Sequence, residues 1–200
     1  MKYRIQNINE LNIDEIKKSV SKERIERAAK FKFDVDRNRS IAVEYLLNEM
    51  ISEYCDGVTT PVTLVYDENG KPHVYKENGD EVEFSLSHSG DYVACIISDK
   101  KCGIDIEKHS NRDYSKIAKR ICTEQELTRV CDEKAFYTLW TLKESVLKAV
   151  GLGLALDMRK VELCHDTNKE EYEAVIEGVT YIGKSLQAPE GYSLSYVEAM

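Results

Sequence analysis

Hydrophobic and polar positions follow helical spacing in four stretches of the chain and form short apolar or alternating runs elsewhere. The helical pattern predicts helices over residues 13–30, 36–54, 113–121 and 132–150, the last of which is expected to end at Gly151 and Gly153. The short runs predict strands over residues 3–8, 62–66, 73–75, 83–86, 92–98, 102–107, 159–165, 171–179 and 192–197. Each half of the chain therefore contains both kinds of element, and we expect an α+β fold.

Two local signals add detail to this pattern. Thr123 and Glu126 have the spacing of a capping box, which predicts a further short helix. Residues 92–98 and 102–107 are separated only by the polar segment Asp99–Lys101. Strands joined by so short a segment usually pair with each other, so we expect a hairpin there.

Composition narrows the class of protein. The chain has 200 residues, of which 42% are hydrophobic and 32% charged, as in globular domains that bury a core. The six cysteines form no C-x-x-C pair and the four histidines are scattered, which disfavours a structural zinc site and indicates reduced thiols. No apolar run is long enough for a membrane span or a secretory signal, so we expect a cytoplasmic protein with no membrane partner.

Charge is unevenly distributed along the chain. The formal net charge of −8 weighs against a nucleic-acid partner. Residues 17–39 nevertheless contain nine Lys or Arg and only four Asp or Glu. This basic segment suits a small anionic ligand, or it is simply a solvated helix face. If two helices form a corner, Arg24, Arg27 and Arg39 could converge on phosphate oxygens, whereas Lys71 looks like an exposed lysine in a turn.

Two acidic residues share one face of the strand expected over residues 102–107. Side chains at positions i and i+2 of a strand point the same way, so Asp105 and Glu107 lie together, opposite Ile104 and Ile106. Adjacent carboxylates repel each other unless a cation lies between them, and a divalent cation with oxygen ligands is the usual solution. The alternative is ordinary alternation with a solvated acidic face.

Lys143 falls at the centre of the apolar face when residues 132–150 are placed on a helical wheel. A lysine in such a position needs an anionic partner or a cleft to open into. Glu144 and Lys148 lie on the shoulder of the same face, where they either belong to a site or form an ordinary surface ion pair at i and i+4.

A loop with small hydroxyl groups is expected where the strand over residues 83–86 ends. Ser87, His88 and Ser89, followed by Gly90, offer hydroxyls, an imidazole and free backbone N–H groups that could cradle a phosphate, unless the serines only cap local backbone. With the acidic pair and the basic segment, this set suits phosphoryl or phosphodiester transfer. Acyl transfer is disfavoured because no G-x-S-x-G or other nucleophile signature is present.

Three motifs follow one another in a characteristic order: Ser87-His88-Ser89, Gly103-Ile104-Asp105-Ile106-Glu107, and Trp140-x-x-Lys143-Glu144-Ser145-x-x-Lys148. Their combination, over about residues 21–156, resembles the Sfp-type 4'-phosphopantetheinyl transferases, which activate carrier proteins of peptide and polyketide synthetases. The resemblance implies a fold of two pseudo-symmetric α/β halves, residues 1–100 and 101–200. It also implies a cleft between the halves that binds coenzyme A and Mg²⁺.

The resemblance further implies roles for individual residues. Asp105, Glu107 and Glu144 would hold the metal, Glu144 would act as general base directly or through a water, and Lys148 would contact the phosphates of the coenzyme. The other coenzyme-binding positions that it implies are Arg24, Arg27, Arg39, Lys71, Ser87 and His88, with His88 near the 3'-phosphate. Arginine at positions 24 and 27 replaces a frequent lysine of the family, which keeps the charge but changes its reach.

The expected reaction moves 4'-phosphopantetheine from coenzyme A to a serine of an apo-carrier protein, either a peptidyl or an acyl carrier, and releases adenosine 3',5'-bisphosphate. The alternative is a non-catalytic coenzyme A- or nucleotide-binding protein that retains the cleft, against which the complete set of Asp105, Glu107, Glu144 and Lys148 weighs. A chain that completes its own cleft is expected to be a monomer. An enzyme of fatty-acid synthesis would differ from one of a secondary pathway in its rates on the two kinds of carrier.

Overall fold

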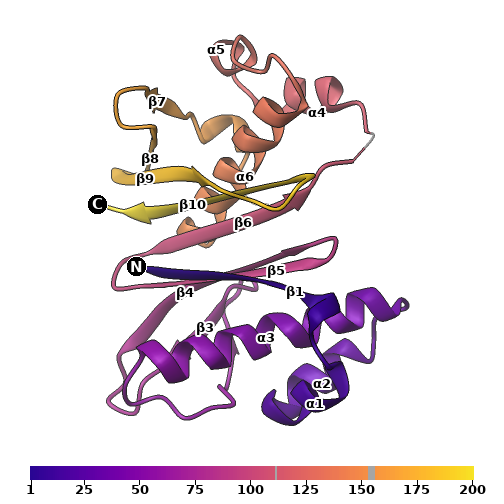
Figure 1. Cartoon of the computed structure of the whole chain (residues 1–200). Helices are drawn as coiled ribbons and strands as arrows, with labels where there is room; N and C mark the ends of the chain where they lie inside the picture. Colours follow the sequence, from indigo (N-terminus) through magenta and orange to yellow (C-terminus); the bar gives the residue numbers. More distant parts are fainter. Residues whose placement is uncertain (111, 153–155) are drawn as a thin grey trace. The chain divides into compact units, whose positions relative to one another are not determined.

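The computed structural model describes residues 1–110, 112–152 and 156–200. The chain divides into two compact units, an N-terminal unit of Met1–Asp99 and a C-terminal unit of Lys100–Met200, and each is described by itself (Figure 1). The helix end expected at Gly153 lies outside the described residues. None of the helices within these residues is long and apolar enough to cross a membrane.

The N-terminal unit is a five-stranded antiparallel sheet of order β1-β5-β4-β3-β2, with its long helix α3 on one face (Figure 1). Leu47 and Met50 of α3 form the core with Val93 and Cys95 of β5. The strands are β1 (Lys2–Asn7), β2 (Val65–Tyr66), β3 (Pro72–Tyr75), β4 (Glu81–Ser89) and β5 (Tyr92–Ser98). The helices are η1 (Ile8–Glu10), α1 (Ile13–Ile16), η2 (Lys17–Ser19), α2 (Lys22–Ala28) and α3 (Asp34–Tyr54).

The C-terminal unit is also a five-stranded antiparallel sheet, of order β6-β10-β9-β8-β7, against which α6 packs. Leu142 and Val146 of α6 form the core with Val197 of β10 and Ala174 of β8. The strands are β6 (Cys102–Lys108), β7 (Cys164–Asp166), β8 (Glu171–Ile176), β9 (Val179–Leu186) and β10 (Tyr192–Ala199). The helices are α4 (Tyr114–Ile121), α5 (Glu124–Leu127), α6 (Glu133–Val150) and η4 (Met158–Lys160).

The two units share one topology. In each unit the first strand is followed by a set of helices that includes one long helix, and then by four strands. The first strand lies at one edge beside the last strand, and the remaining strands follow in reverse order towards the other edge. The expected α+β fold of two pseudo-symmetric halves is therefore confirmed.

The expected hairpin between residues 92–98 and 102–107 is wrong. β5 pairs with β1 and β4, whereas β6 pairs with β10, so the two strands belong to different sheets. The segment Asp99–Lys101 is the connection between the two units rather than a hairpin turn.

Several other elements also differ from the expectation. In place of a strand over 159–165, the Asp157 side chain accepts a hydrogen bond from the Arg159 N–H and begins η4, and β7 starts only at Cys164. The strand expected over 62–66 is only Val65–Tyr66. The helix expected over 13–30 is interrupted, because Val20 is extended and the Ser21 side chain accepts a hydrogen bond from the Arg24 N–H and so begins α2. The strand expected over 171–179 is two strands, β8 and β9. The turn between them has positive φ at Glu177 (51°) and Gly178 (81°), as tight hairpins require.

Candidate active site

Gly103 lets α6 lie directly on β6. A Cβ at this position would be only 1.8 Å from the carbonyl oxygen of Ser145, so no larger residue fits without moving the helix. Because side chains alternate along a strand, Asp105 and Glu107 lie on the same face of β6 as Gly103 and therefore face α6. Asp105 is 5% exposed and Glu107 is half-buried.

Lys148 joins the acidic strand to the helix. Its ammonium group donates hydrogen bonds to Oδ1 of Asp105 at 2.7 Å and to the carbonyl oxygen of Ile104 at 3.0 Å. An ion pair that is largely removed from water is held more firmly than a surface pair. The structure therefore brings together Asp105 and Lys148, which sequence analysis proposed as site residues.

Glu144 lies one helical turn before Lys148 on α6. Burial raises the pKa of its carboxyl group from 4.5 to about 7. The negative charges of Asp105 and Glu107 act in the same direction, while the Lys148 ammonium opposes them. A carboxyl group with a pKa near neutrality can exchange a proton at physiological pH.

The donor set is compatible with a hard divalent cation, but it does not form a ready cage. Within residues 1–110, 112–152 and 156–200, no group of three or more His, Cys, Asp or Glu side chains is arranged to hold a metal ion. The carboxylates of Asp105, Glu107 and Glu144 nevertheless interact unfavourably, and a cation with a preference for oxygen would relieve that repulsion. Their role as metal ligands stays a prediction.

Lys143 serves the core rather than the site. Its side chain is fully buried, and Nζ lies 2.7 Å from Oε2 of Glu126, which is fully buried too. Nζ also donates to the carbonyl oxygens of Val161 at 2.6 Å and Met158 at 3.1 Å. Sequence analysis left an anionic partner or a cleft open for Lys143; the partner is Glu126, which it did not name. The sequence signal that pointed to Glu126 was the capping box that it forms with Thr123, and the structure confirms this capping box.

The other polar positions of the helix motif attach α6 to the sheet. The hydroxyl of Ser145 donates to the carbonyl oxygen of Ser195 on β10 at 3.0 Å, and the hydroxyls of Thr141 and Ser195 lie 2.8 Å apart. Trp140 packs against Phe136, with ring centroids 5.9 Å apart. The contacts of Thr141 and Ser145 with Ser195 hold α6 against β10, whereas Trp140 and Phe136 both belong to α6.

In the N-terminal unit, three predicted arginines contact three different partners. Nε of Arg24 lies 2.8 Å from Oε2 of the buried Glu44, Arg27 lies over the ring of Tyr66, and Arg39 pairs with Asp36 on its own helix. These contacts do not bring the three guanidinium groups to one point. Lys71 precedes β3, in the turn whose backbone N–H groups bond to Asp67.

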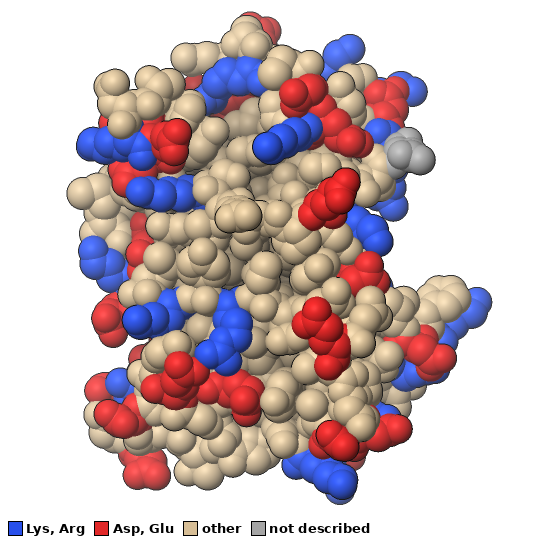
Figure 2. Space-filling view, viewed as in Figure 1, with Lys and Arg blue, Asp and Glu red and all other residues tan. Residues whose placement is uncertain are grey.

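Much of the basic segment is neutralised locally. Of its nine Lys and Arg residues, four form ion pairs, with Asp14, Asp34, Asp36 and Glu44. Basic and acidic side chains are interspersed on the face of the molecule shown in Figure 2. The excess of positive charge that the sequence shows is therefore weaker on the folded surface than the residue count suggests.

The expected loop at Ser87–Gly90 is wrong for its first three residues. Ser87, His88 and Ser89 belong to β4 and are opposite Ala94, Val93 and Tyr92 of β5 in the pairing register. Adjacent side chains of a strand point to opposite faces. Ser87 is accordingly buried and His88 exposed, so the two cannot approach one phosphate from the same side of the sheet.

Comparison with known proteins identifies the family. A model described as the 4'-phosphopantetheinyl transferase superfamily matches residues 101–197, and one described as the N-terminal part of 4'-phosphopantetheinyl transferases matches residues 9–100. The chain therefore belongs to the 4'-phosphopantetheinyl transferase superfamily. The predicted resemblance is confirmed.

Individual relatives agree with this assignment. The chain is 32% identical over 149 residues to 4'-phosphopantetheinyl transferase psf-1 of Bacillus pumilus, covering 72% of this chain and 63% of the relative. It is also 32% identical over 145 residues to 4'-phosphopantetheinyl transferase Sfp of Bacillus subtilis, with 70% and 63% covered. The solved holo-[acyl-carrier-protein] synthase of Thermotoga maritima superposes with a TM-score of 0.40 at 21% identity, covering 50% of this chain and 62% of its own.

The chain spans only about three fifths of the length of the curated relatives that it matches.

Proposed function

We propose that this chain transfers 4'-phosphopantetheine from coenzyme A to a serine of an apo-carrier protein. The observation that carries the proposal is the 2.7 Å contact between Nζ of Lys148 and Oδ1 of Asp105, which joins the D-x-E strand to the W-x-x-K-E-S-x-x-K helix. Membership of the superfamily supplies the class of reaction. Glu144 lies beside this contact, where both acidic residues of the strand affect its pKa.

The reaction displaces one phosphate of a pyrophosphate linkage. The carrier serine oxygen attacks the phosphorus that bears pantetheine, the bond from this phosphorus to the bridging oxygen breaks, and adenosine 3',5'-bisphosphate leaves. Glu144 accepts the serine proton, directly or through a water. The ammonium of Lys148 offsets negative charge on the phosphates.

Mg²⁺ is the metal that the resemblance to the family implies at this site. Mg²⁺ held by carboxylates of Asp105, Glu107 and Glu144 would neutralise charge on the pyrophosphate. Lys148 already neutralises Asp105 in part, which leaves the acidic pair and Glu144 with an excess of negative charge.

Binding of the coenzyme is assigned to the N-terminal unit together with Lys148. We propose that the exposed His88 and the turn residue Lys71 contact its phosphates, along with Arg27 and Arg39. Ser87 is buried on the other face of β4, so we assign it no phosphate contact. Arg24 differs from these residues because its guanidinium is held by the buried carboxylate of Glu44, so we assign it to fixing α2 against α3. We also propose that the protein works as a monomer in the cytoplasm, with carriers of nonribosomal peptide or polyketide synthesis.

The test is a mass measurement on the carrier. Purified chain, coenzyme A, Mg²⁺ and an apo-carrier are incubated, and a gain of one phosphopantetheinyl group on the carrier is expected. Chelation of the metal with EDTA, or the substitution Glu144→Gln, should lower the rate by about a hundredfold or more. Glu173→Gln, which changes an exposed carboxylate on β8, is the matched control and should have no effect.

The same experiment separates the alternatives. Coenzyme A binding without any mass gain on peptidyl or acyl carriers would favour the non-catalytic binding protein. Full activity of Glu144→Gln would contradict the role of this residue as base. Relative rates on peptidyl and acyl carriers would show which kind of pathway the enzyme serves.

A further inference from the structure

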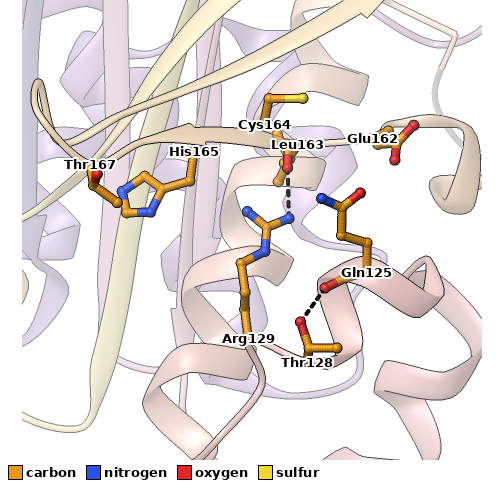
Figure 3. A pocket seen from close by; sticks show the side chains of 8 residues that line it. All are labelled: Gln125, Thr128, Arg129, Glu162, Leu163, Cys164, His165 and Thr167. Carbon is orange, nitrogen blue, oxygen red and sulfur yellow. Dashed lines mark hydrogen bonds between the residues drawn. The ribbon is translucent and has the colours of Figure 1, made fainter.

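The C-terminal unit contains a pocket of about 370 Å³ that none of the predicted site residues lines. One wall comes from α5 and the turn after it, and the other from β7 and the residues beside it (Figure 3). The polar side chains that line it are Gln125, Thr128, Arg129, Glu162, His165 and Thr167. A volume of this size is at the lower end of the range typical of small-molecule sites.

Arg129 supplies the only lining group that is cationic at every pH of interest. One nitrogen, Nη2, donates to the carbonyl oxygen of Leu163 at 2.6 Å. Nε is buried and has no hydrogen-bond partner, and among the described residues no carboxylate lies within ion-pair distance of this guanidinium. A partly buried guanidinium with unused donors is costly unless an acceptor from outside completes its hydrogen bonds.

The two acids nearest in sequence, Glu126 and Asp132, do not compensate this charge. Asp132 caps α6, where its Oδ1 accepts a hydrogen bond from the Ala135 N–H. Glu126 lies one helical turn before the arginine, but Nζ of Lys143 is 2.7 Å from its Oε2 and the backbone N–H of Leu163 donates to its Oε1 at 3.0 Å. Leu163 is thus fixed through both backbone groups, by Glu126 on one side and by Arg129 on the other. These two bonds connect the two walls of the pocket before any ligand arrives.

The remaining donors lie on either side of Arg129. Figure 3 shows its guanidinium between Gln125 and His165, with Thr167 beyond the histidine. The ring of His165 is stacked on Tyr172, with centroids 4.3 Å apart and an interplanar angle of 9°, which fixes its orientation. Thr128 contributes less, because its hydroxyl donates to the carbonyl oxygen of Gln125.

We propose that this pocket binds a small organic anion, whose carboxylate or phosphate group pairs with Arg129 and accepts hydrogen bonds from Gln125, His165 or Thr167. A planar guanidinium suits both kinds of oxyanion. The exposed carboxylate of Glu162, also on the lining, favours a ligand with one anionic group over a polyanion. The proposal does not depend on the transfer reaction, since the pocket shares no residue with the proposed active site.

NMR signals of residues that line the pocket can be used to measure binding directly. The full isotope-labelled chain is titrated with inorganic phosphate and, separately, with sodium acetate, at constant ionic strength adjusted with NaCl. We expect saturable shifts of the His165 ring and Thr167 amide signals, and the probe that saturates identifies the preferred head group. Absence of saturable shifts with both probes would overturn the proposal.

Variants assign the binding to the guanidinium. Arg129→Gln should weaken binding of the effective probe by about tenfold or more. Arg159→Gln removes an exposed arginine of the same unit that pairs with Asp157, so it is the matched control and should bind as the unsubstituted chain does. Equal binding by the folded Arg129→Gln protein would refute the assignment.

Two further variants are used in case Arg129→Gln does not fold because its hydrogen bond to the Leu163 carbonyl is lost. If Arg129→Gln fails to fold, Arg129→Lys keeps the charge and a donor for the Leu163 carbonyl but loses the planar fork, and Gln125→Leu leaves Arg129 intact. Both should fold, as checked by circular dichroism, and both should bind the effective probe several-fold more weakly. Unchanged affinity in both would contradict the proposed site.

Discussion

At the residue scale, two lysines of α6 have opposite environments. Lys143 is fully buried against Glu126, whereas Lys148 is partly exposed and reaches Asp105 at the edge of the core. A buried ion pair adds little stability compared with apolar residues of the same shape, but removing one partner leaves an uncompensated charge in the interior. The two lysines should therefore respond differently to substitution, one in folding and the other in catalysis.

Lys143→Met is expected to lower the free energy of unfolding by about 3–5 kcal/mol, because Glu126 is left buried without its cationic partner. Urea denaturation followed by circular dichroism measures the change. Lys116→Met is the control, since Lys116 is 81% exposed and pairs only with Asp113. It should change stability by less than about 1 kcal/mol.

A double-mutant cycle shows whether the pair itself is responsible. The combined variant Lys143→Met with Glu126→Gln should be less destabilised than the sum of the two single variants, because neither charge is then left alone. Strict additivity would mean that the cost comes from packing around each side chain separately.

His73 provides a pH-dependent contact in the N-terminal unit. A hydrogen bond with Glu81 raises the pKa of its imidazole above 6.5, burial opposes this shift, and Asp67, 3.4 Å from Nε2, supports it, while Lys71 opposes it. The protonated ring therefore stabilises the folded state below pH 6.5. This contribution is lost as the pH rises through the raised pKa of the folded state.

An NMR titration of the His73 ring should give a pKa above 6.5, and Glu81→Gln should lower it. Glu77→Gln, on the preceding turn, removes an exposed carboxylate and serves as the control. If Glu81→Gln leaves the titration unchanged, the hydrogen bond is not the cause of the shift.

Part of the site could be predicted from single residues. Alternation along β6 was sufficient to place Asp105 and Glu107 on one face, and the helical wheel showed that Lys143 needs an anionic partner or a cleft to open into. Which of the two applies, and which residue is the anion, could not be predicted, because Glu126 meets Lys143 and the Leu163 N–H across a large separation in sequence. Metal binding by the three carboxylates is a prediction that the structure leaves open.

At the element scale, hydrophobic periodicity and capping residues predicted most helices correctly, but the predictions for some connections were wrong. The short segment Asp99–Lys101 looks like a hairpin turn, yet the strands on either side pair with β1, β4 and β10. Which strands pair depends on the burial of side chains over the whole unit. The short length of one polar segment therefore does not predict the pairing of the strands beside it. The same limit explains why the Ser87–Ser89 stretch was expected as a loop: polar side chains do not prevent pairing with β5.

Gly103→Ala tests how closely α6 must approach β6. The added methyl group would overlap the carbonyl of Ser145, a backbone atom that cannot move without the helix, so we expect a loss of roughly 3 kcal/mol or more, or failure to fold. Gly178→Ala is the control. It has open space but a φ of 81°, so it should cost only about 1–2 kcal/mol. Equal thermal stability of the two variants would contradict this packing.

At the scale of the whole molecule, the two units repeat one topology without a repeated sequence. Each contains a first strand, a set of helices and four further strands in the same spatial order. A layer of helices on a sheet is largely specified by the pattern of apolar and polar positions, and different residues can produce the same pattern. The repeated topology is therefore not visible when the sequences of the two units are compared. It was expected only through resemblance to the family.

The proposed function divides binding and chemistry between these units, which steady-state kinetics can test. Lys71→Ala in the N-terminal unit should raise KM for coenzyme A by about tenfold with little change in kcat, because Lys71 binds ground and transition states alike. Lys148→Ala should instead lower kcat by about a hundredfold or more, because charge on the leaving phosphate grows in the transition state. Lys18→Ala, an exposed lysine outside the proposed set, should change neither constant. A fall in kcat for Lys71→Ala at unchanged KM would contradict this division.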